Sequence, residues 1–381
     1  MDFELSKEQR DIVRAAREFA RGEFTQERAL EFDRTETFDL GLWRRACELG
    51  FVGTFISEEY GGAGFGFLEH CLINEEFWAA DPGCAQGCLA TTFGAEMIQL
   101  FGSEEQKRLV LPALIAGEAI IATAITEPEA GSDPSRASTA AVREGDEWVI
   151  DGAKMFITNG TLARWVLVFA VTDPDCPDPH ARHGFFLVDA DTPGYGATKL
   201  RGKLGIRASD TAELSFTGVR VPGDCLVGER GKGFEQLMAF FNRTRLHICA
   251  QAVGLGRACL EESVRHVRGR RQFGRPLAEF QATRFKVAEM ATKVRAARNL
   301  YYEAAWLVDR GTIDHGLIAM AKWFSARAAV EVADEAVQLH GGYGYFDEHK
   351  VQRLYRDAKI LEIYEGTKEI EKIIVANSLL G

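Results

Sequence analysis

One glutamate stands in a setting that favours proton-transfer chemistry. Glu365 lies in the segment RDAKILEIYEGT at positions 356–367, just before a helical pattern whose apolar face is Ile370, Ile373 and Ile374. A carboxylate at the start of a helix can simply stabilise the helix dipole. In an apolar pocket, desolvation would raise its pKa towards neutrality, and it could act as a general base. The residues themselves leave both interpretations open.

Two short segments could present hydrogen-bonding groups to a flat heteroaromatic ligand. ITEPEAGSD at positions 125–133 combines a threonine, a proline, a glycine and a serine in an irregular turn that offers N–H groups and hydroxyls. KMFITNG at positions 154–160 places Phe156 and Thr158 on one face of a predicted strand, where a ring can stack and a hydroxyl can bond. Either segment alone is more typical of core and turn.

Two further segments could hold a charged, extended ligand. RRQFG at positions 270–274 belongs to a basic run that also contains Arg265, Arg268 and Arg275. Such a run is usually a solvated helix face, but arginine also binds diphosphate groups in a bidentate manner. QLHGGYGY at positions 338–345 contains glycines that let a ligand approach the backbone, although a turn that ends a helix has the same composition.

Several familiar sources of chemistry are missing from the sequence. There is no G-x-G-x-x-G turn and no G-x-x-x-x-G-K-[ST] loop, so a Rossmann dinucleotide site or a P-loop has no local support. There is also no serine nucleophile elbow and no H-E-x-x-H motif. His180 and His183 have a spacing close to that of metal ligands, but a pair of solvated loop histidines is the expected interpretation. No metal site is predicted.

Three stretches with different hydrophobic periods must position these segments. Residues 1–118 have a helical period, residues 119–227 have the period of strands, and residues 228–381 return to a helical period. Helices, then a small sheet, then a helical bundle make an α+β layout rather than an alternating βαβ chain.

Local signals mark the elements within these stretches. Capping boxes pair Ser6 with Gln9 and Ser103 with Gln106 at the starts of two helices. In the third stretch, four long helical segments are separated at positions 273–276, near 311 and at 341–344.

The middle stretch shows strand patterns and the turns between them. Positions 165–171 and 212–216 suit strands of a sheet. Asp151–Gly152 predicts a hairpin turn, and the proline-rich segment 173–184 predicts a surface loop between strands.

Composition limits the class of protein. A chain of 381 residues predicts two or three packed subdomains, and 46% hydrophobic with 27% charged residues is ordinary for a globular protein. The net charge of −11 argues against binding to nucleic acid or to an anionic membrane. Eight scattered cysteines and no secretory segment indicate reduced thiols in a cytoplasmic protein, and no apolar run approaches the ~18 residues of a membrane span.

The five segments become specific in combination. ITEPEAGSD, KMFITNG, RRQFG, QLHGGYG and RDAKILEIYEGT occur in this order, and over nearly its whole length the chain resembles the acyl-CoA dehydrogenase family. The resemblance implies FAD bound between an N-terminal helical domain (1–118), a central β-barrel-like domain (119–227) and a C-terminal four-helix bundle (228–381). It also implies a homotetramer in which FAD straddles two subunits.

The resemblance assigns roles to named positions. Glu365 would be the catalytic base. The FAD-binding positions would be Ile125, Thr126, Ser132, Phe156, Thr158, Arg270, Phe273, Gln338, Gly341, Gly342, Thr367 and Glu369. Those that would contact the ADP half of a neighbour's FAD are Arg270, Phe273, Gln338, Gly341 and Gly342. The positions near acyl-CoA would be Ser132, Asn242, Arg245, Tyr364 and Gly366.

The chain departs from the family pattern at a few positions. Some members carry the base on the helix around Arg245, but residues 242–245 of this chain include no carboxylate, so Glu365 is the only candidate base that a motif supports. Phe156 stands where tryptophan is common, and Asn242 is often aspartate. Glu369 is often glutamine, so this chain would place an extra negative charge near FAD.

The implied reaction is α,β-dehydrogenation of an acyl-CoA thioester to a trans-2-enoyl-CoA. Glu365 would take the α-proton while a hydride leaves the β-carbon for flavin N5. The backbone N–H of Glu365 and a ribityl hydroxyl of FAD would hold the thioester carbonyl. Electrons would then pass to an electron-transferring flavoprotein.

The resemblance also implies two alternative functions and a class of substrate. An acyl-CoA oxidase would keep the fold and use O2, and a non-catalytic flavin-bearing binding protein would keep the fold without turnover. The acidic net charge and the intact IYEGT segment argue against the second alternative. Members of the family that act on a dicarboxylyl-CoA place a positive charge in the stretch that corresponds to residues 81–92. This chain has no lysine or arginine there, so the resemblance disfavours a terminal carboxylate on the acyl group. A short, branched or alicyclic acyl group is expected.

Overall fold

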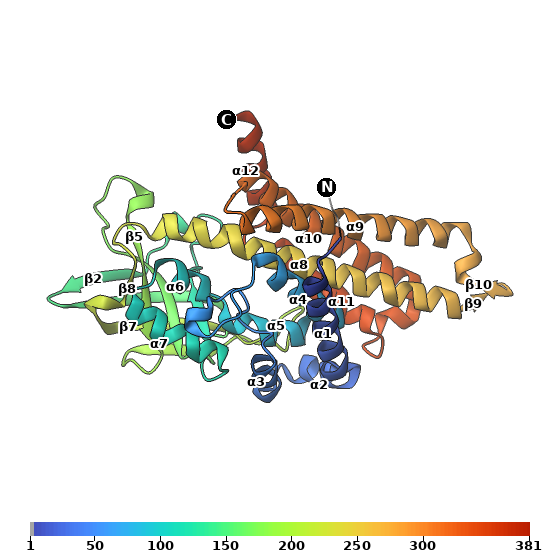
Figure 1. The fold of residues 1–381 in the computed structure, drawn as a ribbon, viewed down its shortest axis with the longest axis horizontal. Coiled ribbons are helices and arrows are strands. Elements are labelled where there is room, and N and C mark those ends of the chain that lie inside the picture. The colour runs from blue at the N-terminus through green and yellow to red at the C-terminus, as the bar shows by residue number, and fades with distance from the viewer. Residues whose placement is uncertain (1–3) are drawn as a thin grey trace.

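Sheet and long helices occupy different parts of an elongated molecule. A computed structural model describes residues 4–381. The sheet lies at one end, and the longest helices run from it towards the other end (Figure 1). Helices come first in the chain, then the sheet, then helices again, so the α+β prediction is confirmed. Within residues 4–381, no helix is long and apolar enough to cross a membrane.

Seven α-helices precede the sheet in the described chain. Ser6 and Ser103 each accept the backbone N–H of the residue three positions on, and that glutamine's side chain accepts the serine N–H, so both predicted capping boxes are confirmed. Helix α4 is buried on nearly all sides because it packs against α1, α5, α8 and α9. The helices are α1 (Lys7–Glu23), α2 (Gln26–Thr35), α3 (Leu40–Glu48), α4 (Phe67–Ala80), α5 (Pro82–Leu89), α6 (Ala95–Phe101) and α7 (Glu104–Ile115).

An eight-stranded sheet forms the middle of the chain. Its order is β6-β7-β3-β2-β4-β5-β8, and β1 pairs in parallel with the central strand β4. The fully buried run predicted as a strand is β4, which accounts for its lack of alternation. The strands are β1 (Ile121–Ala124), β2 (Ala140–Glu144), β3 (Glu147–Thr158), β4 (Trp165–Val171), β5 (His183–Asp189), β6 (Tyr195–Lys199), β7 (Thr211–Pro222) and β8 (Leu226–Val227).

Two sequence predictions about this sheet are wrong. The hairpin between β2 and β3 turns at Gly145–Asp146, whereas Asp151–Gly152 lies inside β3 at a register shift against β7. There the Asp151 side chain accepts the backbone N–H of Gly218 at 2.7 Å, so the Asp-Gly pair forms a bulge rather than a turn. His183 is buried in β5 and stacks on Phe169, so it is not a solvated loop histidine.

Three long helices and two shorter ones complete the fold. Helices α8 and α10 pack closely along much of their length, and α9 packs beside both (Figure 1). The three predicted breaks are confirmed: a short hairpin separates α8 from α9, Gly311 separates α9 from α10, and Gly341 ends α10. The prediction of a fourth long helical segment is wrong, because the turn that contains Glu365 divides it into α11 and α12. The helices are α8 (Gly233–Gly269), α9 (Gln281–Asp309), α10 (His315–His340), α11 (Lys350–Ala358) and α12 (Lys368–Leu380), and the hairpin is β9 (Arg271–Gln272) with β10 (Arg275–Pro276).

Candidate active site

Glu365 lies in the turn between α11 and α12 and faces α8. The hydroxyl of Thr244 on α8 donates to Glu365 Oε2 at 2.5 Å. The Nε of Arg245 donates to the backbone carbonyl of Glu365 at 3.3 Å. The N-cap of α12 is Thr367, whose hydroxyl accepts the N–H of Ile370 at 3.5 Å. The Glu365 side chain is therefore directed at α8 and is not the capping group of its own helix.

The turn that carries Glu365 is held in an uncommon backbone conformation. Glu365 has φ 55° and Gly366 has φ 99°, and a glutamate pays a steric penalty in this region. The ammonium of Lys322 on α10, which is fully buried, donates to the carbonyl of Gly366. Contacts from α8 and α10 thus hold the backbone on either side of the candidate base.

The surroundings of Glu365 make it a stronger base than an exposed glutamate. Burial raises the pKa of Glu365 above its ordinary value, and this effect outweighs the Thr244 hydrogen bond and the charges of Arg245 and Lys322, which lower it. The side chain is only half-buried by the chain itself, so a ligand can still reach it. The geometry therefore suits a general base that receives a proton from a bound molecule.

A buried ion pair shapes the segment 125–133. The ammonium of Lys154, on β3, lies 2.8 Å from Glu127 Oε1 and donates to the carbonyl of Ile125 at 2.9 Å. The other oxygen of Glu127 accepts the N–H and the hydroxyl of Ser138 at 2.7 and 2.8 Å. The backbone carbonyl of Thr126 accepts the N–H of Met155 at 2.9 Å, which joins this turn to the second predicted segment.

Phe156 and its neighbours are left open to a ligand. Phe156 is 67% exposed although it lies within β3, and its φ of 63° turns the strand locally. The other predicted positions of these two segments are also open to solvent in part. Half-buried side chains are those of Ile125, Thr126 and Thr158, and Ser132 is exposed. A Cβ added to Gly131 would meet no atom within 4 Å, so this backbone is free to approach a ligand. An uncovered aromatic ring with hydroxyls close to it in sequence and open backbone at Gly131 fits a flavin.

The predicted ADP-binding positions come together at the other end of the chain. Arg270, Gln338, Gly341 and Gly342 all line a pocket of about 560 Å³. Phe273, in the β9–β10 hairpin, is 91% exposed. Cβ atoms at the two glycines would meet nothing within 4 Å, so the pocket floor is open backbone. This hairpin lies at the end of the molecule opposite the sheet (Figure 1).

Three of the side chains expected near acyl-CoA are buried or half-buried, namely Asn242, Arg245 and Tyr364. Arg245 is buried and pairs with Glu371 at 2.9 Å. Asn242 is buried, with its Oδ1 3.0 Å from His315 Nδ1. The Tyr364 hydroxyl donates to Gln251 Oε1. These side chains already have protein partners, so their contact with CoA stays a prediction.

The remaining predicted positions lie around α12. Gly366 and Thr367 are half-buried in the turn and cap just described, and Glu369 is exposed in the first turn of α12. Of the isoleucines expected to form the apolar face of this helix, Ile373 is largely exposed, and the buried residue of α12 is instead Glu371. The apolar face predicted for α12 is therefore not buried within one chain.

The sequence did not predict four side chains that contact the Glu365 turn or the segment 125–133, namely Thr244, Lys154, Lys322 and Glu371. Thr244 was named only as a position without a carboxylate and Lys154 only as the first residue of KMFITNG, and Lys322 and Glu371 belong to none of the five segments. The available signal was weak: a lysine inside the strand pattern of 154–158, and a lysine within the apolar pattern of α10. Their roles depend on partners more than 25 positions away for Lys154 and more than 40 for Lys322.

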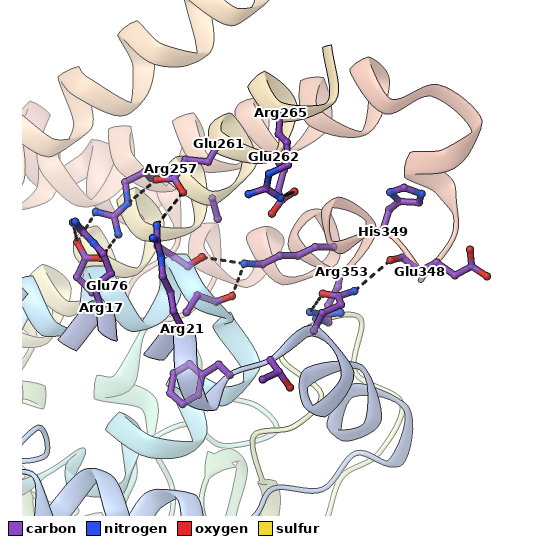
Figure 2. A pocket seen from close by; sticks show the side chains of 17 residues that line it. Arg17, Arg21, Glu76, Arg257, Glu261, Glu262, Arg265, Glu348, His349 and Arg353 are labelled. Atoms are coloured by element: carbon purple, nitrogen blue, oxygen red, sulfur yellow. Dashed lines mark hydrogen bonds and ion pairs between the residues drawn. The ribbon is translucent and has the colours of Figure 1, made fainter. Parts of the chain in front are cut away.

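A separate pocket of about 630 Å³ lies where α1, α4, α8 and α11 meet (Figure 2). Charged side chains line it, and they pair mainly with one another. Arg17 and Arg257 both bind the buried carboxylate of Glu76, at 2.9 and 2.6 Å. Arg353 pairs with Asp81 at 2.9 Å. None of the predicted site residues lines this pocket, which is a charged junction between the N-terminal and C-terminal helices.

Family models match almost the whole chain. The model for "Acyl-CoA dehydrogenase, N-terminal domain" matches residues 6–118, the model for the middle domain matches residues 122–219, and the model for the C-terminal domain matches residues 231–380. The chain therefore belongs to the acyl-CoA dehydrogenase family. It is an oxidoreductase of the class that uses FAD as cofactor, as the sequence predicted.

Individual relatives match from end to end. The chain is 39% identical over 382 residues to a probable acyl-CoA dehydrogenase, YngJ, of Bacillus subtilis, with 100% of both chains covered. Butyryl-CoA dehydrogenase from Megasphaera elsdenii is 37% identical, with a TM-score of 0.95 and 100% of both chains covered. A chain in a structure of the electron transferring flavoprotein of Acidaminococcus fermentans is 38% identical, with a TM-score of 0.96 and the same coverage.

Proposed function

We propose that this protein is a cytoplasmic acyl-CoA dehydrogenase that converts an acyl-CoA to its trans-2-enoyl-CoA, with Glu365 as the base that removes the α-proton. The observation that carries the proposal is the setting of Glu365. Its carboxylate has a raised pKa, accepts the hydroxyl of Thr244 and remains reachable from outside the chain.

The chain's own groups account for the proton-transfer half of the reaction. Glu365 accepts the α-proton, and the Thr244 hydroxyl fixes the rotamer of its carboxylate so that the other oxygen is free to receive that proton. The backbone N–H of Glu365 stabilises negative charge on the thioester oxygen as the α-proton leaves. FAD, when bound, supplies the acceptor for the β-hydride.

We assign two groups of residues to FAD. Ile125, Thr126, Phe156 and Thr158 bind the flavin ring, and their support is the open, ion-pair-braced turn beside β3. Thr367, Glu369 and Ser132 complete this assignment from the family motif.

The second group serves a neighbouring chain. Arg270, Phe273, Gln338, Gly341 and Gly342 lie at the end of the molecule opposite the sheet (Figure 1). Because one chain keeps the two groups apart, we propose that the ADP half of each FAD is bound by a second copy, as in a homotetramer.

One feature each supports the proposed acyl group and the proposed electron acceptor. Segment 81–92 is buried and contains no cation, and its one carboxylate, Asp81, is occupied by Arg353. Since the family resemblance places the far end of the acyl group near this segment, we infer a short, branched or alicyclic acyl group without a terminal carboxylate. The match to a chain in a structure of an electron transferring flavoprotein supports such a protein as the electron acceptor.

The experiment is anaerobic mixing of the FAD-loaded protein with a panel of acyl-CoA thioesters. We expect butyryl-, isovaleryl- or cyclohexanoyl-CoA to bleach the flavin, and glutaryl-CoA not to do so. Binding without bleaching by every thioester would favour the non-catalytic alternative. Oxygen consumption as fast as turnover with ferrocenium would identify an oxidase instead.

A further inference from the structure

A second carboxylate is buried directly behind the candidate base. Glu371 is 0% exposed and is the buried residue of α12. Its Oε1 lies 2.9 Å from Arg245 Nε, and neither of its carboxylate oxygens has a well-aligned hydrogen bond. A Cβ added to Gly366 would overlap Glu371 Oε1, so this carboxylate packs against the turn that carries Glu365.

Two buried cations share this space with the two carboxylates. Arg245, on α8, touches both the carbonyl of Glu365 and the carboxylate of Glu371. Lys322, on α10, donates to the carbonyl of Gly366, and its charge attracts both carboxylates. The titratable or charged groups that face Glu365 or Glu371 from the packed elements are Arg245 and Cys249 on α8, Lys322 on α10, Glu96 on α6 and Tyr364 in the turn itself.

The balance of these charges decides how well Glu365 accepts a proton. Without Glu371, the two cations would act on Glu365 with Glu96 as the only other carboxylate of this group to oppose them, and they would favour the ionised form of Glu365. Such a carboxylate stays ionised but is a weak base. We propose that Glu371 is a positioning residue that balances the charges of Arg245 and Lys322 behind the turn, and thereby sets how strongly Glu365 accepts a proton.

The cluster changes its charge in the neutral range of pH. Burial raises the pKa of Glu371 to about 7, and burial lowers the pKa of Lys322 to about 8. The two carboxylates repel each other, so each ionises less readily once the other is ionised. As pH rises through about 7, Glu371 becomes charged and Glu365 gains basicity.

The inference rests on the proposed function. It is tested by two variants that change the charge of the cluster in opposite directions. Glu371→Gln removes the balancing charge, so the rising limb in the pH profile of flavin reduction should move to lower pH by about one unit or more, and the plateau rate should fall. Lys322→Gln removes a cation, so the limb should move to higher pH. Glu289→Gln and Lys372→Gln make the same charge changes on exposed helix positions and should leave the profile unchanged.

The pH dependence of unfolding gives a readout that does not need activity. The pKa of Glu371 is raised from its ordinary 4.5 to about 7 in the folded chain, so it stabilises the fold below about 4.5 and loses this contribution as pH rises to about 7. The wild-type urea midpoint should therefore fall between about pH 5 and about pH 8 more than that of Glu371→Gln.

The outcomes separate this inference from the proposed function. If no acyl-CoA bleaches the wild-type flavin, the proposed function fails, and the unfolding comparison alone judges the buried titration of Glu371. If the wild type is bleached and both variants keep its pH profile, Glu371 only fills space and the inference is overturned. If Glu371→Gln does not fold, the shift expected for Lys322→Gln decides, because a profile equal to wild type would overturn the charge balance.

Discussion

Replacing Lys154 by methionine should show how the segment 125–133 is built. The substitution keeps the length of the side chain and removes the ammonium that pairs with Glu127 at 2.8 Å and holds the carbonyl of Ile125. Glu127 would then be a buried carboxylate with hydrogen bonds from Ser138 and Thr139 but no counter-charge. Removing one partner of a buried ion pair costs about 3–5 kcal/mol.

The pKa values of the two partners show how burial and pairing act on each of them. The pKa of Glu127 falls from 4.5 to about 2, chiefly because Lys154 and its hydrogen bonds overcome the effect of burial, and that of Lys154 falls from 10.5 to about 8 through burial. The two shifts have opposite effects on stability near neutral pH, because the fold favours the ionised form of Glu127 and disfavours that of Lys154. The attraction within the intact pair offsets part of the cost of burying it, whereas the single variant leaves Glu127 buried without a counter-charge.

Urea unfolding of the FAD-loaded protein measures this cost. Because Glu127 can take up a proton when Lys154 is absent, the loss should be larger at about pH 8 than at about pH 5. The double variant Lys154→Met with Glu127→Gln should recover part of the loss, since it removes the unpaired charge. FAD retention should fall in the single variant. A single variant as stable as wild type at about pH 8 would refute the assigned role of this pair.

Three further outcomes are expected. Gly366→Ala should lower both the thermal stability and the rate of flavin reduction, because Gly366 has φ 99° and the new Cβ would overlap the buried carboxylate of Glu371. The control variant Gly22→Ala in α1, which has open space around it, should keep the wild-type melting temperature. Arg270→Ala should weaken FAD retention on gel filtration, and Arg268→Ala should not; equal retention in both would mark the run as a solvated face. Thr244→Val removes a bond that lowers the pKa of Glu365, so its activity limb should move to higher pH; an unmoved limb would count against that bond.

Local sequence patterns correctly predicted those elements whose start or burial depends on residues close by in the sequence. The Ser6 and Ser103 caps involve partners three positions away, and the apolar run that became β4 needs only burial on both faces. Asp151–Gly152 has the composition of a hairpin turn, but β3 continues to Thr158 because it pairs with β7, a distant strand. His183 similarly became buried because β5 pairs with β4 along its whole length.

The site was predicted as motifs but not as a charge network. The family resemblance carried by the five segments predicted Glu365 as the base and the two groups of FAD positions, and these assignments stay predictions. The partners of these groups could not be predicted, because Thr244 and Lys322 reach the Glu365 turn from α8 and α10. Glu371 is polar in a helix whose isoleucines were expected to be buried, and only the packing of α12 on α10 places it inside.

The most direct test of the account is flavin reduction by Glu365→Gln in anaerobic stopped-flow mixing with an acyl-CoA that bleaches the wild type. Glutamine keeps size and shape but cannot accept the α-proton, so the variant should retain FAD and bind the thioester. Its reduction rate should fall by at least the ~10²–10⁴ that a positioned general base contributes. A purely structural glutamate at this turn would cost about 1 kcal/mol of stability and leave the chemistry nearly intact. Reduction at a rate near that of wild type would show that Glu365 is not the base.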